Sequence, residues 1–564
     1  MTTRPTAAEE ASRLAETVSP DVRGGWALRA VTVARRGPDL RSHLMIAALL
    51  GIILCICLRT GIVPMRSYVS DVMYFAENGW RVLWGQRPHV DYSSGLGPVS
   101  FLLAALGLKL AGGSLDGLGY GSAVAAMAIG IWAYALLARR VSGLLAVAGG
   151  AMLCLLAVAP LQTGESYWLS TIAMRHNRQG YALLGLLIVE SFPMRPQGPA
   201  RGIGGALSTG VLCAILLFLK ANYFLVSLVL AAISVVWSGR LERRRLAGLA
   251  VGFAVAATAF LAYLRFDVGA MLADLRMAAD ARAGAISLKP VLRVLAENFP
   301  GFLILAGLAA LTQVVVTPPA SGGWVGRLLR FRPLALAGIV YCAGVLLIRS
   351  NCQIERLPLN ELLALLFLDC VLQCSWLDVR QALAVATMGI GLILATQSPD
   401  GLALVNGLRL KLQLPQKFAY PVTDGGFAGA AFLDDYLENR GTHRAFGSFL
   451  ATYLTDGRDL LRRHLLPGEK VTTMDMYNPF PFALGIEPPR GGIACAEFNY
   501  HYSDRYRLTA DAYFGNADVV MYPKEHELVD TSWQALLKYY YPEMERRFVP
   551  VAESAQWRMY RRRK

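Results

Sequence analysis

Long apolar runs separated by short polar segments occupy the chain from about residue 43 to residue 397. Many of them approach or exceed the roughly 18–20 residues that a helix needs to cross the hydrocarbon core of a bilayer. About twelve runs can be counted, at residues 43–63, 97–111, 119–138, 142–160, 180–192, 203–219, 221–238, 246–264, 291–316, 334–348, 357–374 and 381–397. The pattern predicts a polytopic α-helical membrane protein.

Beyond residue 397 the pattern changes to that of a water-exposed α/β domain. Pro-Gly turns separate a helix-like stretch, AFLDDYLENR, from strand-like stretches such as KVTTMDM and ADVVMYP. We therefore expect a cytoplasmic segment over 1–42, a transmembrane domain over 43–400 with an outer loop at 64–96, and an extracytoplasmic α/β domain over 401–564.

Basic residues indicate which side each loop occupies. Arginines gather in short loops: Arg139 and Arg140, Arg195 and Arg201, Arg240 to Arg245, and Arg327 to Arg332. Since cytoplasmic loops are rich in Lys and Arg, these loops should lie inside. The loops at 175–180, 265–290 and 349–356, and the C-terminal domain, then lie outside.

Twelve spans from a cytoplasmic N-terminus would leave the C-terminus inside, which contradicts this assignment. The span count should therefore be odd, near eleven or thirteen. Either the short run 97–111 lies in the interface or re-enters, or the polar-flanked segment 161–175 hides another crossing.

Composition agrees with a membrane protein. Of 564 residues, 55% are hydrophobic and 17% are charged, and the mean hydropathy is +0.41. The net charge of +15 resides mainly in the basic loops, so nucleic acid is not an expected partner. The nine cysteines include no Cys-x-x-Cys pair, and Cys495 stands alone in the C-terminal region, so neither a disulfide framework nor a structural zinc site is indicated.

Residues 67–98, SYVSDVMYFAENGWRVLWGQRPHVDYSSGLGP, interleave charged and aromatic side chains directly after the first apolar run. The segment is too charged to cross a bilayer and too apolar for a free loop. Trp80, Trp84 and the tyrosines suit the membrane interface, where a ring has one apolar and one wet side. We expect a pair of short interfacial helices that form the floor of a site at headgroup level.

Acidic and cationic groups collect on the outer face. The acids are Asp71, Glu77 and Asp91, and the cations are Arg175, Arg178, Lys220 and Arg349. Arginine binds phosphate through its planar fork, lysine adds a point charge, and a carboxylate can take a proton from a hydroxyl. Simpler explanations exist: Asp71 as a helix cap or solvated acid, and Lys220 as a lysine that extends from a helix end to the interface.

Three stretches resemble a known family. The outer loop SDVMYFAENGWRVLWGQRPHVDYSSGLGPVSFLLAALGLKLAGG, the turn RHNRQGYALLGLL and the helix end LLFLKANYFL are similar to regions of GT-C superfamily glycosyltransferases. This superfamily includes the protein O-mannosyltransferases and the aminoarabinose transferases, which use polyprenyl-phosphate sugars. The resemblance covers about residues 43–400.

The resemblance implies roles for individual residues. Asp71 would be the catalytic base. Because Asp-Val replaces the Asp-Glu of many members, the second acid stays open between Asp91 and Glu77, as does a divalent cation, Mg²⁺ or Mn²⁺. The donor phosphate would be bound by Arg175, Arg178, Lys220 and Arg349. Substrate contacts would come from Tyr74, His89, Tyr92, His176, Asn177 and Asn222.

The expected function is transfer of a sugar from a polyprenyl-phosphate donor to a glycan, glycolipid or protein acceptor, by inversion, on the outer face of a bacterial inner membrane. One alternative is a lipid-linked oligosaccharide polymerase or ligase. The other is a transporter or flippase, although the two halves show no matching pair of interrupted segments. The sequence has no Walker loop, no dinucleotide-binding fingerprint and no Gly-x-Ser-x-Gly elbow.

Overall fold

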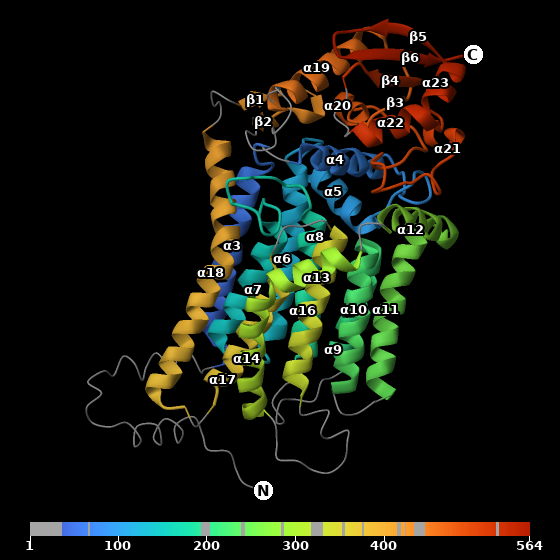
Figure 1. Ribbon diagram of the computed structural model, residues 1–564. Coiled ribbons are helices and arrows are strands. Elements are labelled where there is room, and N and C mark those ends of the chain that lie inside the picture. Colours follow the sequence, from blue (N-terminus) through green and yellow to red (C-terminus); the bar gives the residue numbers. More distant parts are fainter. Residues whose placement is uncertain are drawn as a thin grey trace.

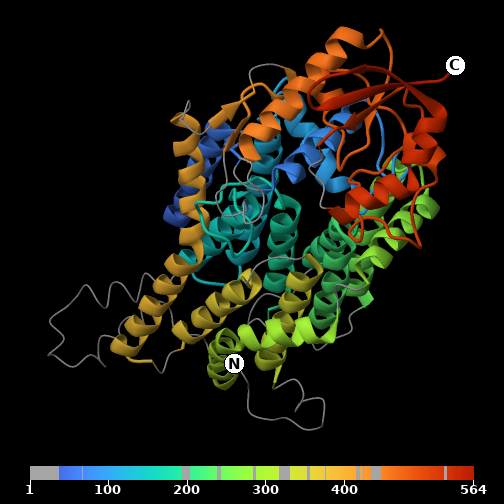
Figure 2. The same cartoon turned by 45° about the horizontal axis from the view of Figure 1, so that its top comes forward.

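A helical bundle carries a smaller α/β domain at one end (Figure 1). The computed structural model describes residues 37–65, 68–192, 203–237, 243–283, 287–316, 331–351, 356–374, 377–413, 419–422, 425–433, 446–525 and 530–564. The expected segment 1–42 therefore lies mostly outside the described residues. The α/β domain sits over helices α4 and α5 in both views (Figures 1 and 2).

Fifteen described helices make up the bundle and the layer beneath the α/β domain. They are α3 (Leu40–Thr60), α4 (Val69–Leu83), α5 (Pro98–Leu110), α6 (Gly117–Leu137), α7 (Gly143–Val158), α8 (Arg175–Ser191), α9 (Ile203–Leu219), α10 (Ala221–Trp237), α11 (Arg243–Tyr263), α12 (Val268–Arg282), α13 (Leu288–Glu297), α14 (Phe299–Val316), α16 (Arg332–Asn351), α17 (Pro358–Leu372) and α18 (Val379–Leu412).

The polytopic helical class is confirmed. Among the described residues, five helices are long and apolar enough to cross a bilayer: α3, α6, α11, α16 and α18. A sixth span results if α13 and α14, which meet at 62°, count as one. The expected eleven to thirteen spans therefore require the shorter apolar helices, such as α5, α7, α9 and α10, to cross as well.

Two local expectations before residue 180 are resolved by the backbone. Residues 159–174 form turns without a helix, so no helical crossing is hidden there. Residues 84–97 also form turns. The expectation of a second short interfacial helix within residues 67–98 was therefore wrong. Gly85 and His89 have φ of 76° and 68°, in the left-handed region, which a continuing helix does not accommodate.

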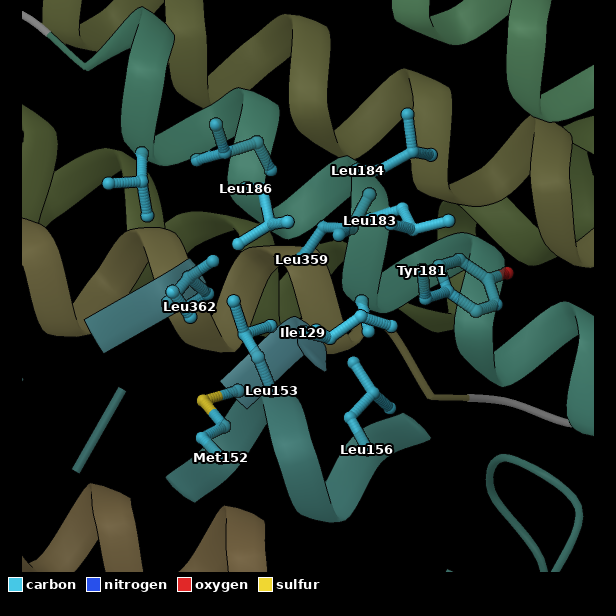
Figure 3. Packing of buried hydrophobic residues seen from close by; sticks show 14 of the residues in the cluster. Ile129, Met152, Leu153, Leu156, Tyr181, Leu183, Leu184, Leu186, Leu359 and Leu362 are labelled. Atoms are coloured by element: carbon cyan, nitrogen blue, oxygen red, sulfur yellow. The ribbon is translucent and has the colours of Figure 1, made fainter. Parts of the chain in front are cut away.

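Large apolar side chains from four helices fill the centre of the bundle (Figure 3). Ile129 of α6, Leu153 of α7, Tyr181 of α8 and Leu362 of α17 belong to one buried cluster. Because lipid tails are as apolar as these side chains, close packing between the helices, rather than transfer out of water, stabilises this part of the fold.

The α/β domain has a four-stranded sheet in the order β3-β4-β6-β5, with β3 and β4 parallel and the other pairs antiparallel. A separate antiparallel pair, β1 and β2, lies near the top of α18. The strands are β1 (Ala419–Pro421), β2 (Ala431–Leu433), β3 (Val471–Thr473), β4 (Val519–Pro523), β5 (Phe548–Glu553) and β6 (Trp557–Arg562). The helices are η1 (Gly425–Phe427), α19 (Phe446–His464), α20 (Phe480–Leu484), α21 (Ala510–Phe514), α22 (Asp530–Tyr539) and α23 (Tyr541–Arg547).

The expected C-terminal α/β domain is confirmed, with two local differences. The stretch AFLDDYLENR begins as strand β2 rather than as a helix, because residues 431–433 pair with 419–421; residues 434–440 lie outside the described part. Helix α18 also continues past residue 400, the expected domain boundary, with Pro399 inside it.

Helix α4 joins the bundle to the α/β domain through buried polar contacts. Glu77 and Arg81 form an ion pair of 3.1 Å with 3% and 2% of their side chains exposed. Glu77 Oε2 accepts a hydrogen bond from the Asn478 backbone N–H at 2.7 Å. Arg81 Nη1 donates to the carbonyl of Pro489 at 2.8 Å. The helix is thus fixed to a domain that follows it by some four hundred residues.

Close helix packing depends on glycine where α6 meets α5. A Cβ atom on Gly121 would lie 2.1 Å from the Leu103 carbonyl oxygen, a backbone atom that cannot rotate away. A Cβ atom on Gly51 of α3 would meet nothing within 4 Å. Small residues of this kind let membrane helices approach each other closely.

We predict that Gly121→Ala lowers the stability of the purified protein by about 1–3 kcal/mol, the usual effect of overpacking. Gly51→Ala is the matched helical control and should leave the midpoint of thermal unfolding in detergent unchanged or slightly raised, because alanine favours helix. Equal midpoints for Gly121→Ala and the wild type would contradict the packing described here.

Candidate functional site

Lys220 lies at the junction of α9 and α10, where buried amides orient its ammonium. Lys220 Nζ donates to Asn351 Oδ1 at 2.7 Å and to Asn177 Oδ1 at 3.1 Å. Asn351 is itself held by Asn222, which donates to the same Oδ1 at 2.9 Å, and by Tyr223, whose hydroxyl accepts from Nδ2 at 2.9 Å. Because amides carry no net charge, these contacts orient the ammonium without neutralising it.

Asp71 lies in the first turn of α4 and faces the charge of Lys220. Burial raises the pKa of the Asp71 carboxyl to about 6, and the positive charge of Lys220 opposes that rise. Among the described residues, no hydrogen bond or ion pair engages the Asp71 side chain. A carboxylate with these properties is available to accept a proton near neutral pH.

A loop of the α/β domain supplies a third side of the site, which the sequence analysis did not identify. Cys495, Glu497 and His501 have ligand atoms within 4.8 Å of one another. Burial, together with the negative charge of Asp71, raises the pKa of Glu497 to about 7. Burial and the positive charges of Arg282 and Lys220 lower the pKa of His501 to about 3.

The only sequence signal for this loop was the spacing in CAEFNYH. Glu497 and His501 are four residues apart, near enough for a single turn of the chain to bring them together. Cys495 was expected to stand alone, because the C-terminal region of the sequence holds no second cysteine. The structure instead brings a carboxylate and an imidazole to it.

Aromatic and histidine side chains complete the surroundings of Asp71. The Tyr74 and His501 rings have centroids 6.3 Å apart, and those of Phe75 and His176 are 5.4 Å apart. His176 interacts electrostatically with Lys220 and His501. The structure therefore brings together Asp71, Tyr74, His176, Asn177, Lys220 and Asn222 of the residues singled out in the sequence.

The expected phosphate-binding arginines differ in their surroundings. The Arg178 side chain is fully buried, and its guanidinium pairs with Asp400 at 2.5 Å and donates to the Leu156 carbonyl at 2.8 Å. Arg175 donates to the Leu118 carbonyl at 3.2 Å and lines a small cavity beside His176. Arg349 lies in the last turn of α16, close in sequence to Asn351.

The remaining candidates hold segments of the outer layer together. The Asp91 carboxylate accepts from the Arg87 backbone N–H at 2.8 Å and pairs with Arg490 at 3.1 Å. His89 Nδ1 lies 2.8 Å from a carboxylate oxygen of Asp274 in α12. The Arg81 guanidinium, already paired with Glu77, lies 4.9 Å from the Tyr92 ring centroid. Among the expected acids, Asp71 is the carboxyl whose pKa the positive charge of Lys220 lowers.

No protein-family model matches this chain, and no curated protein sequence matches it. Solved structures similar to it include ArnT from Cupriavidus metallidurans in the apo state, with 14% identity over 91% of this chain and 97% of that chain and a TM-score of 0.43. ArnT bound to undecaprenyl phosphate has 14% identity over 92% and 97%, with a TM-score of 0.41. The oligosaccharyltransferase of Archaeoglobus fulgidus, in complex with Zn and sulfate, has 11% identity over 91% and 73%, with a TM-score of 0.34.

Proposed function

We propose that this protein transfers a sugar from a polyprenyl-phosphate donor to an acceptor hydroxyl at the outer face of a bacterial inner membrane. The observation that carries the proposal is the arrangement of Asp71 and Lys220. An uncommitted carboxylate faces an oriented ammonium where apolar helices meet a polar domain. A lipid tail requires the helices, and a sugar and its acceptor require the polar side.

The proposed reaction is a displacement at the anomeric carbon. The Asp71 carboxylate takes the proton of the acceptor hydroxyl while the acceptor oxygen forms a bond to the anomeric carbon. The bond from that carbon to the phosphate oxygen breaks, and its electron pair stays on the phosphate. The ammonium of Lys220 stabilises the charge that develops on this leaving group. Direct displacement inverts the anomeric configuration.

The α/β domain is proposed to lie outside the cytoplasm and to help hold the acceptor, a glycan, glycolipid or protein. Its loop with Glu497 and His501 lies beside Asp71, the group that would meet the acceptor hydroxyl. Arg175, beside the cavity next to His176, is a second proposed contact for the donor phosphate.

We predict that Asp71→Asn abolishes release of free polyprenyl phosphate from polyprenyl-phosphate sugars, followed by mass spectrometry on purified protein. The variant should unfold at the same temperature as the wild type or higher at pH 8. Above about pH 6 the native carboxylate is charged and buried, and the neutral amide removes this cost.

Asp459→Asn is the control for this prediction, because the Asp459 side chain is 48% exposed on the α/β domain. It should retain wild-type turnover. Undiminished release by Asp71→Asn, measured beside this control, would refute Asp71 as the base.

Lys220→Met should weaken binding of polyprenyl phosphate itself. Loss of a hydrogen bond to a charged group costs about 1.5–3 kcal/mol, roughly a tenfold to hundredfold rise in Kd. The exposed lysine of α5, Lys109, provides the matched Lys109→Met control. Titration of both proteins in the same detergent measures the difference, and equal affinities would exclude Lys220 as a phosphate contact.

A further inference from the structure

We propose that Cys495, Glu497 and His501 bind one Zn²⁺ ion on the face of the α/β domain that meets Asp71. The three residues offer a sulfur, a carboxylate oxygen and an imidazole nitrogen. This binding does not depend on the proposed sugar transfer, because it rests on the donor atoms and their arrangement alone.

The spacing of the donor atoms fits a zinc ion after a small contraction. All three lie within 4.8 Å of one another. A tetrahedral zinc ion with its usual bond lengths holds neighbouring ligand atoms roughly 3.5 Å apart. Rotation of the Glu497 and His501 side chains can close the difference, because neither side chain has a hydrogen-bond or ion-pair partner in the part of the chain that the structure describes.

The backbone holds the three residues in place before any ion binds. The neighbours of Cys495 are fixed on both sides: the Ala494 N–H donates to the Ser93 carbonyl at 2.8 Å, and the Ala496 N–H donates to the Met476 carbonyl at 2.8 Å. The His501 N–H donates to the Glu497 carbonyl at 2.9 Å and closes a tight turn, in which Asn499 has a φ of 60°. This turn brings the ligand atoms of Glu497 and His501 to within 4.8 Å of each other.

The His501 imidazole lies against the backbone at Gly95, where no side chain occupies the space. A Cβ atom on Gly95 would lie 3.3 Å from His501 Nδ1. The absence of a side chain at Gly95 therefore allows the ring to pack against this backbone.

The chemistry of the donors selects among divalent cations. Thiolate and imidazole ligands suit zinc, whereas magnesium and manganese prefer carboxylate, carbonyl and water oxygens. This donor set therefore favours Zn²⁺ over Mg²⁺ and Mn²⁺. Three protein ligands leave a fourth position for water or another molecule, as in zinc sites with an open position.

The charges around the cluster also fit a divalent cation. Asp71 interacts electrostatically with both Cys495 and Glu497, while Arg282 and Lys220 are the cations near His501. With the thiolate formed on metal binding, three negative groups face two positive ones. A divalent ion replaces the repulsion among the negative groups with attraction.

The full-length protein in detergent should be stripped with a chelator, reloaded with Zn²⁺, desalted and measured for metal content by mass spectrometry. We expect one zinc ion per wild-type chain, and loss of that ion in Cys495→Ser and in His501→Gln. Substitution with Co²⁺ should give the thiolate-to-cobalt charge-transfer absorption in the wild type and not in Cys495→Ser. The control is Cys55→Ser, since Cys55 of α3 is exposed and distant in sequence, and it should behave as the wild type.

Each other outcome overturns the proposal. A wild-type protein that retains no zinc after reloading has no such site. Full zinc content in both Cys495→Ser and His501→Gln, or a charge-transfer band that disappears in Cys55→Ser, places the metal elsewhere. Because the measurement is metal content rather than turnover, its failure leaves the sugar-transfer proposal intact, and zinc binding by a protein without transferase activity would leave this site intact.

Discussion

The buried ion pair between Glu77 and Arg81 is the contact on which the geometry of the candidate site depends. A buried pair is costly to desolvate, and it is stable only where other hydrogen bonds satisfy its atoms. Here the Asn478 N–H and the carbonyls of Pro489 and Gly491 do so. Since the same helix carries Asp71, this contact sets where the carboxylate lies relative to the loop that holds Glu497.

The charged groups of this protein fall into two kinds. Arg178, in the first turn of α8, and Arg356 both pair with Asp400 of α18. Arg356 also pairs with Glu361, so two carboxylates balance the two guanidiniums, because burial without partners would be prohibitive. Asp71 differs from them, because no side chain pairs with this acid among the described residues. The amides of Asn177 and Asn351 orient Lys220 nearby. The first kind stabilises the fold, and the second kind is suited to bind and transform a charged substrate.

Much of this could be read from the sequence, because apolar length and charge placement are local properties. The runs of apolar residues identified the bundle, and the charged aromatic segment after the first run led to α4 and Asp71. Lys220 stands out in the sequence because it interrupts an apolar run. The environment of Arg178 could not be foreseen, since its partner Asp400 comes from a helix more than two hundred residues later.

The sequence did not reveal that residues 495–501 lie beside Asp71, because here too the contacting residues are far apart in the chain. Nothing in CAEFNYH indicates that it folds over α4, because the contacts that place it, such as the Ala494 N–H to the Ser93 carbonyl, join distant parts of the chain. The short strand at residues 431–433 was likewise decided by pairing with 419–421 rather than by helical propensity.

A structure of the protein with bound polyprenyl phosphate, determined by electron cryomicroscopy, tests the central claim most directly. The account places the phosphate within hydrogen-bond distance of Lys220 Nζ, about 2.7–3.2 Å, with Asp71 on the side toward the α/β domain. A phosphate bound elsewhere, with Lys220 still held only by Asn177 and Asn351, would contradict it.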